Sequence, residues 1–72
     1  MVWKNPSDGK YDLYINGDLA GYIVRVKYKN GTVSWSGIAM NKKTKRTSAG
    51  KNYPTLAAAK SGVEKEARAL RK

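Results

Sequence analysis

The sequence predicts an α+β fold in which an antiparallel sheet of three to four strands is followed by one C-terminal helix packed on one face. Two Asn-Gly dipeptides, at 16–17 and 30–31, each lie between runs of alternating apolar and polar residues, a pattern typical of β-hairpins. After Pro54, apolar residues recur with the period of an α-helix. A chain of 72 residues has room for one domain with one thin core.

The single expected domain, residues 1–72, divides into three parts. Residues 1–9 form an N-terminal segment outside the periodic pattern, so Trp3 either closes the end of the core or is exposed. Residues 10–50 form the antiparallel sheet, within which 45–49 is either a short edge strand or a loop. Residues 54–71 form the helix.

The second Asn-Gly turn sets the expected register of the sheet. A two-residue turn at 30–31 pairs Tyr28 with Val33 and Val26 with Trp35 on one face. The first turn pairs Tyr11 with Tyr22 and Leu13 with Ala20, which adds its strand to the same face. We expect this face to form the core, with the side chains of Tyr11, Leu13, Tyr22, Val24, Val26, Tyr28, Val33 and Trp35. A register slip of one residue would exchange the two faces.

The C-terminal segment has a start signal and an apolar stripe. Pro54 prevents helical continuation from upstream, and Thr55 is placed to cap the first exposed amides. The stripe that should face the sheet consists of Leu56, Ala59, Val63, Ala67 and Leu70. Its small residues, with Gly62 beside them, would let the helix lie close to the sheet.

The charges of the chain are strongly segregated. It carries 15 Lys and Arg against five Asp and Glu, a formal net charge of +10. No acid occurs from Leu19 to Val63, whereas nine Lys and Arg fall within that stretch. A run of like charge repels itself unless a partner supplies the opposite charge, and nucleic acid is the commonest such partner. The sequence therefore predicts a nucleic-acid-binding protein.

The sheet face opposite the expected core, extended by a basic turn, carries the candidate site. The candidate nucleic-acid-binding residues are Arg25, Lys27, Lys29, Ser34, Ser36, Lys42, Lys43, Lys45 and Arg46. Cations bind phosphates, hydroxyls donate to phosphate oxygens, and Arg can read guanine edges. Ile23 and Ile38 are expected to lie exposed and opposed on this face. Only Tyr14 among the aromatic residues projects from it, so duplex DNA is favoured, while RNA and single strands stay open.

Several local features occur in an order shared with a known family. They are Gly21 opening a basic strand, the hairpin from Gly31 to Trp35, the turn Asn41-Lys42-Lys43, Gly50, Tyr53, Thr55 and the alanines at 57–59. Gly21 through Ala67 thereby resembles the three-stranded-sheet-plus-helix DNA-binding domain shared by plant ethylene-response-factor (Apetala-type) proteins and the arm-binding domains of tyrosine integrases. The resemblance implies that the sheet enters the major groove, with Arg25, Lys27 and the basic positions around Lys45 and Arg46 as DNA contacts.

The chain departs from that family at three points. It has an extra strand before Gly21, it lacks an acidic pair after Thr55, and it places Trp35 on the expected core face. The last departure argues against base contact by Trp35.

Other function classes are disfavoured by the composition. The absence of Cys and His excludes disulfides, Cys/His zinc sites, thiolate nucleophiles and imidazole acid–base chemistry. The acids are scattered, so we expect no catalytic residue, no metal, no cofactor and no enzyme activity. No apolar run has the length of a signal peptide or a membrane span, which predicts a soluble cytoplasmic protein without a membrane partner.

Two functions therefore stay open. The first is a small module that binds duplex DNA through the basic sheet face, such as a phage or mobile-element accessory protein. The second is a protein-binding inhibitor or adaptor that uses the same basic face against an acidic partner. The sequence does not indicate the oligomeric state, the nucleotide preference or the biological process.

Overall fold

The computed structural model describes residues 1–71, and it confirms the α+β class with more strands than the sequence predicts. An antiparallel sheet of six strands is followed by one C-terminal helix. The elements are β1 (Val2–Ser7), β2 (Lys10–Ile15), β3 (Asp18–Lys27), β4 (Val33–Asn41), β5 (Arg46–Thr47), β6 (Lys51–Tyr53) and α1 (Leu56–Ala69).

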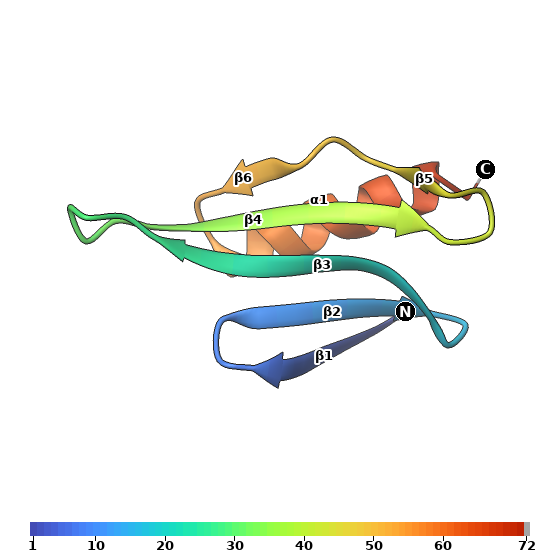
Figure 1. Ribbon diagram of the computed structural model, residues 1–72, viewed down its shortest axis with the longest axis horizontal. Coiled ribbons are helices and arrows are strands. Elements are labelled where there is room, and N and C mark those ends of the chain that lie inside the picture. Colours follow the sequence, from blue (N-terminus) through green and yellow to red (C-terminus); the bar gives the residue numbers. More distant parts are fainter. Residues whose placement is uncertain (72) are drawn as a thin grey trace.

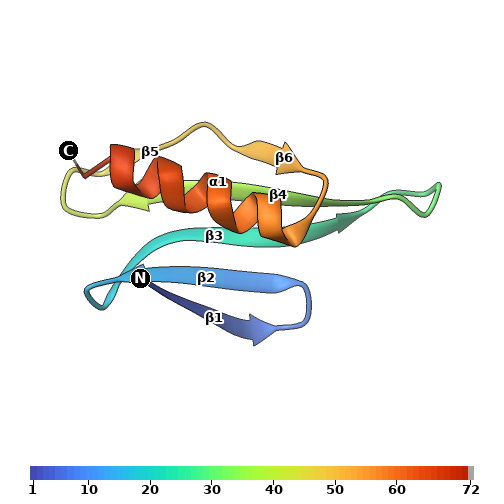
Figure 2. The ribbon, with the colours of Figure 1, turned by 180° about the vertical axis from the view of Figure 1, so that it is seen from behind.

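The strands form a meander that opens into two short pieces at one edge. The order is β1-β2-β3-β4, and the second edge of β4 pairs with both β5 and β6. Between these two, the Ser48 amide donates to the Ala39 carbonyl at 2.9 Å, and the Ser48 hydroxyl accepts from the Ala39 amide at 2.9 Å. Figure 1 looks onto the sheet face without a helix, and Figure 2 shows α1 lying across the other face.

The N-terminal segment belongs to the sheet. Residues 1–9 were expected outside it, but β1 pairs with β2 and places Trp3 opposite Leu13. The Trp3 ring packs against the core, and its indole N–H donates to Glu64 Oε2 at 2.7 Å. Trp3 therefore closes one side of the core, which is the first of its two expected roles.

The helix spans Leu56–Ala69, so it begins two residues later and ends two residues earlier than the predicted range 54–71. Thr55 is the N-cap residue, and its hydroxyl accepts from the Ala58 amide at 3.1 Å, as the sequence predicts. Residues 45–49 contain the short strand β5, and the additional strand β6 precedes the helix and pairs Tyr53 with Trp35.

The helix lies close to the sheet because glycines face it. Ala59, Val63 and Ala67 of the predicted stripe are buried, and Val63 lies over Gly21 and Gly37. A Cβ on either glycine would lie 2.6 Å from a Val63 methyl carbon, so any side chain there would clash. Ile23 pairs with Gly37 on the adjacent strand. The buried core consists of Leu13, Ala20, Ile23, Ala39, Ala59, Val63 and Ala67.

The second hairpin has a three-residue loop, and the predicted two-residue turn is wrong. Tyr28 N donates to Thr32 O at 2.9 Å, and Gly31 N donates to Tyr28 O at 3.0 Å. Gly31 has φ +87°, the left-handed glycine that ends a type I turn in three-residue hairpin loops. The register therefore pairs Arg25 with Trp35, whereas the sequence-based register pairs Val26 with Trp35.

A bulge at the other end of β3 also changes the register by one residue. The first Asn-Gly turn pairs Ile15 with Asp18 as predicted. Leu13 then pairs with Gly21 rather than Ala20, so Ala20 is an extra residue in β3. Beyond this bulge, the residues of β3 that face the helix are the reverse of those predicted.

The two sets of β3 side chains therefore exchange faces. Ile23 and Arg25 lie on the helix side, whereas Tyr22, Val24 and Val26 lie on the face without a helix. The predicted sides of β2 and β4 are correct, with Tyr11, Leu13 and Trp35 toward the helix and Ser34, Ser36 and Ile38 away from it. Tyr28 and Val33 are exposed rather than buried.

Replacing Gly21 by Ala should lower the free energy of unfolding by about 1–3 kcal/mol, the range typical of overpacked cores. The new Cβ would lie 2.6 Å from Val63 Cγ1 and 2.8 Å from the Ile38 carbonyl oxygen, and a backbone atom cannot easily move away. Gly50→Ala is the matched control because no heavy atom lies within 4 Å of its Cβ. Urea unfolding monitored by Trp fluorescence measures both. Equal stability of the two variants would contradict the close contact at Val63.

The exchange of faces on β3 predicts opposite outcomes for two neighbouring residues. Ile23→Ser should lower the free energy of unfolding by about 3–5 kcal/mol, because it removes a fully buried side chain and buries a hydroxyl. Val24→Ser, on the other face and 38% exposed, should lower it by about 1 kcal/mol or less. Thermal melts of the two variants measure the difference. If Val24→Ser proves the more damaging, the register is wrong.

Candidate nucleic-acid interface

One face of the sheet has no helix packed on it, and we call it the open face. Within residues 1–71, no helix or loop packs over it (Figure 1). Strand pairing and the alternation of side chains place on it Val2, Lys4, Lys10, Asp12, Tyr14, Leu19, Tyr22, Val24, Val26, Ser34, Ser36, Ile38 and Met40.

The middle of the open face is aromatic and aliphatic. Tyr22 lies between Asp12 of β2 and Ile38 of β4, and a shallow depression beside it is also lined by Leu19 and Val24. Leu19 and Tyr22 are half-buried and Val24 is exposed, because no second layer covers them. A contiguous exposed apolar surface in a small domain is typical of a binding site.

Two lysines lie among these apolar side chains. Lys4 Nζ lies 5.0 Å from the centroid of the Tyr14 ring, within the range of a cation–π contact. Lys10 pairs with Val24 and lines the depression beside Tyr22. The open face thus combines aromatic rings with positive charges at short range.

Further cations lie at the two ends of the long axis. The hairpin that carries Lys29 extends from one end, and the turn after β4 lies at the other (Figure 1). The molecule measures 39 Å along this axis. The cations of the second end are Lys42, Lys43, Lys45 and Arg46. Within residues 1–71, none of these five cations forms an ion pair.

Two predicted site residues do not lie where the sequence places them. Arg25 is on the helix side, and its guanidinium donates to Asp8 Oδ2 at 2.9 Å. Lys27 lies two residues after Arg25 in the same strand, so it also lies on the helix side. The predicted basic sheet face, with Arg25 and Lys27 in its middle, is therefore wrong, and the cause is the register of β3.

The nine predicted residues fall into three groups. Ser34 and Ser36 lie on the open face as predicted. The Ser34 hydroxyl donates to the Tyr53 carbonyl oxygen at 3.4 Å, so part of its hydrogen-bonding capacity is already used. Arg25 and Lys27 form the second group, on the helix side. The five cations at the two ends form the third.

The residues of the open face that sequence reasoning missed include Lys4, Lys10, Tyr22 and Val24. A signal for the last two was present in the loop Lys29-Asn30-Gly31. Its glycine stands third, which fits a three-residue loop as well as a two-residue turn. Lys4 was missed because Asn5 and Pro6 interrupt the alternation of the first strand.

Among residues 1–71, no three His, Cys, Asp or Glu side chains gather into a group that could hold a metal ion. Over the same residues, no helix has the length and apolar character needed to cross a membrane. No family model, curated protein or solved structure matches this chain.

Proposed function

We propose that the protein is a small nucleic-acid-binding module that holds a single strand across the open face, without catalysis. The observation that carries the proposal is an uncovered sheet face with tyrosines in its middle and unpaired cations at both ends. Base stacking and phosphate attraction require these two features together.

The charge distribution supports a polyanion as the partner. The formal net charge is +10, and the ion pairs among residues 1–71 all lie on the helix side or at its edge. These pairs involve Asp8, Glu64 and Glu66, and Asp18 pairs with Ile15 on the helix side, so only Asp12 among the acids lies on the open face. The open face and its two ends therefore keep an excess of positive charge.

The aromatic side chains support a single strand. Tyr14 and Tyr22 lie on adjacent strands of the open face, and Tyr28, the residue after β3, has the same parity and is 46% exposed. Unpaired bases stack on such rings, whereas the bases of a duplex are already stacked on each other. Four-stranded sheets of other single-strand binders use rings on an open face in this way.

A duplex fits the open face less well. Reading a major groove needs side chains such as Arg that reach the base edges. The arginine expected to do so, Arg25, is turned to the helix side and paired with Asp8. The central positions of β3 on the open face are instead Tyr22, Val24 and Val26, which offer stacking and apolar contact.

An acidic protein partner is the second candidate, and the apolar residues of the open face favour it. Val24 is exposed and Ile38 and Met40 are half-buried, and together they form an aliphatic strip that a protein surface could bury. A protein interface of this kind would draw part of its energy from apolar burial, so its affinity would depend less on salt than that of nucleic acid.

Removal of one ring tests the stacking role. Tyr22→Val should weaken binding to a single-stranded oligonucleotide at least fivefold, since one stacked base contributes about 1–3 kcal/mol. Valine keeps the β propensity of the position, so the fold should persist. Tyr22→Phe keeps the ring and should bind like the parent protein. Fluorescence anisotropy with a labelled oligonucleotide measures all three. Equal affinities would remove stacking at Tyr22 from the mechanism.

The salt dependence of binding tests which cations contact phosphate. Each phosphate contact contributes about −0.7 to the slope of log affinity against log salt for a single strand. Removing Lys4 and Lys10 together by Gln substitution should therefore make the slope shallower by about 1.4 units. The double variant Arg25→Gln/Lys27→Gln carries the same charge change on the helix side and should leave the slope unaltered.

The same titrations separate the alternatives. We expect this pattern with single strands, and we expect duplex DNA of equal length to bind more weakly. If the Arg25/Lys27 variant alone changes the slope, binding occurs on the helix side and the proposal is wrong. If no nucleic acid binds in a salt-dependent way, the acidic protein partner becomes the leading function.

A further inference from the structure

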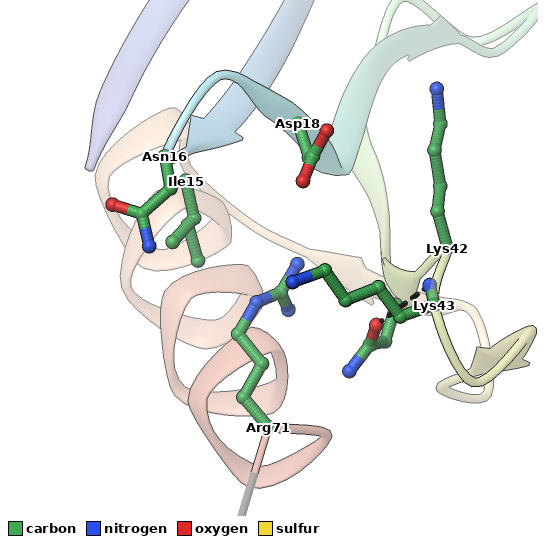
Figure 3. Close-up of a pocket in the computed structure, with 7 residues that line it drawn as sticks. Ile15, Asn16, Asp18, Lys42, Lys43 and Arg71 are labelled. Carbon is green, nitrogen blue, oxygen red and sulfur yellow. Dashed lines mark hydrogen bonds between the residues drawn. The ribbon is translucent and has the colours of Figure 1, made fainter.

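A cavity of about 300 Å³ lies at the end of the sheet where three segments meet. These are the β2–β3 turn, the turn after β4 and the C-terminal end of α1 (Figure 3). The lining residues are Ile15, Asn16, Asp18, Asn41, Lys42, Lys43 and Arg71. The volume is at the lower end of the range typical of small-molecule sites.

Hydrogen bonds hold the walls of this cavity in place. Asn41 Nδ2 donates to the Leu70 carbonyl at 3.0 Å, and Asn41 Oδ1 accepts from the Lys43 amide at 3.0 Å. Arg71 Nη1 donates to the carbonyl oxygens of Met40 at 3.2 Å and Ala67 at 2.9 Å. The turn after β4 is thereby tied to the end of the helix.

These bonds also satisfy two carbonyl oxygens that would otherwise repel an anion. The C-terminal carbonyls of a helix carry partial negative charge and lack partners within the helix. Here Arg71 and Asn41 donate to two of them, at Ala67 and Leu70. Arg71 uses only Nη1 for its two backbone bonds, which leaves its other guanidinium nitrogens for a ligand.

The charged residues that line the cavity have a net positive formal charge. Lys42, Lys43 and Arg71 carry three positive charges and Asp18 one negative charge, which gives +2. The Lys42 ammonium points away from the other two cations (Figure 3), so Lys43 and Arg71 are the cations placed to contact a ligand. Figure 3 shows the Lys43 ammonium and the Arg71 guanidinium pointing toward one another, with the Asp18 carboxylate directed at the same space. Within residues 1–71, neither cation forms an ion pair. Two like charges directed at one space are stabilised when an anion lies between them.

We propose that this cavity binds a phosphate monoester group. Such a group carries about −1.5 to −2 charges at neutral pH, which matches the net charge of the lining residues, and Lys and Arg are its usual ligands. The phosphate belongs either to a free nucleotide or to the end of a nucleic-acid strand. The proposal does not depend on the open face, because Lys43 and Arg71 lie outside it.

The test titrates the ¹⁵N-labelled protein with inorganic phosphate, AMP and adenosine and follows the amide NMR signals. Phosphate and AMP should shift the amides of Asn16, Asp18 and Lys43, whereas adenosine should not. Lys43→Gln should weaken phosphate binding about tenfold, as expected for the loss of a charge-assisted hydrogen bond. Lys65→Gln is the matched control, because it removes the same charge from an exposed helix position outside the cavity.

Asp18→Asn gives a change in the opposite direction. It raises the net charge of the lining residues to +3, so inorganic phosphate should bind several-fold more tightly. Absence of phosphate binding, equal effects of Lys43→Gln and Lys65→Gln, or weaker binding by Asp18→Asn would each overturn the proposal.

Two oligonucleotides, one with a 5′-phosphate and one with a 5′-hydroxyl, identify the source of the phosphate. A gain in affinity from the 5′-phosphate that Lys43→Gln abolishes assigns the cavity to strand ends. AMP binding without such a gain assigns it to free nucleotides, and either result supports the phosphate site. Binding of the 5′-hydroxyl strand reports on the open face and the cations at its ends, whereas the gain from the 5′-phosphate reports on the cavity, so failure of one proposal can be told from failure of the other.

Discussion

The contact of Val63 with Gly21 and Gly37 determines most of the structure. These glycines lie on the adjacent strands β3 and β4, and a Cβ on either would clash with a Val63 methyl group. The absence of side chains at this pair lets the helix approach the sheet closely, so Gly21 faces the helix. Every later residue of β3 is then assigned to a face by alternation. The bulge at Ala20 and the three-residue loop ending at Gly31 are the two adjustments of β3 that accommodate this choice.

Much of the fold could be predicted from local patterns, whereas the faces of β3 could not. The Asn-Gly dipeptides, Thr55 and the stripe around Val63 act over a few residues, so the hairpins and the helix follow from the sequence. The loop length and the bulge each change the register by one residue, and neither has an unambiguous local signal. Apolarity also misled the prediction, since Tyr22, Val24 and Val26 have the stronger apolar pattern but lie on the open face. Gly21 and Ile23 are buried because they fit under the helix.

The excess of positive charge at the candidate site could be predicted from the sequence, whereas the side of the sheet on which each cation lies could not. The absence of acids from Leu19 to Val63 is visible in the sequence and explains why the ends of the sheet keep unpaired cations. The distribution between the two sides depends on tertiary contacts. Lys51 pairs with Glu66, Arg25 with Asp8, and Lys60 lies over the rings of Trp3 and Tyr11, all on the helix side. The open face thus combines aromatic rings and cations from several strands, and no single strand shows this combination by itself.

The pairing of Ser48 with Ala39 has a consequence for self-association. The edge strands of an open sheet present unpaired N–H and C=O groups to which another copy could add a strand. Along β4, the short strands β5 and β6 flank Ser48. The Ser48 amide donates to the Ala39 carbonyl, and the Ser48 hydroxyl accepts from the Ala39 amide. At the opposite edge, β1 carries Lys4 and Pro6 and its pairing with β2 is irregular between Lys4 and Ser7. Charge, proline and irregular pairing all discourage strand addition. The chain can therefore expose an aromatic surface to a ligand while both edges of its sheet resist growth into fibrils.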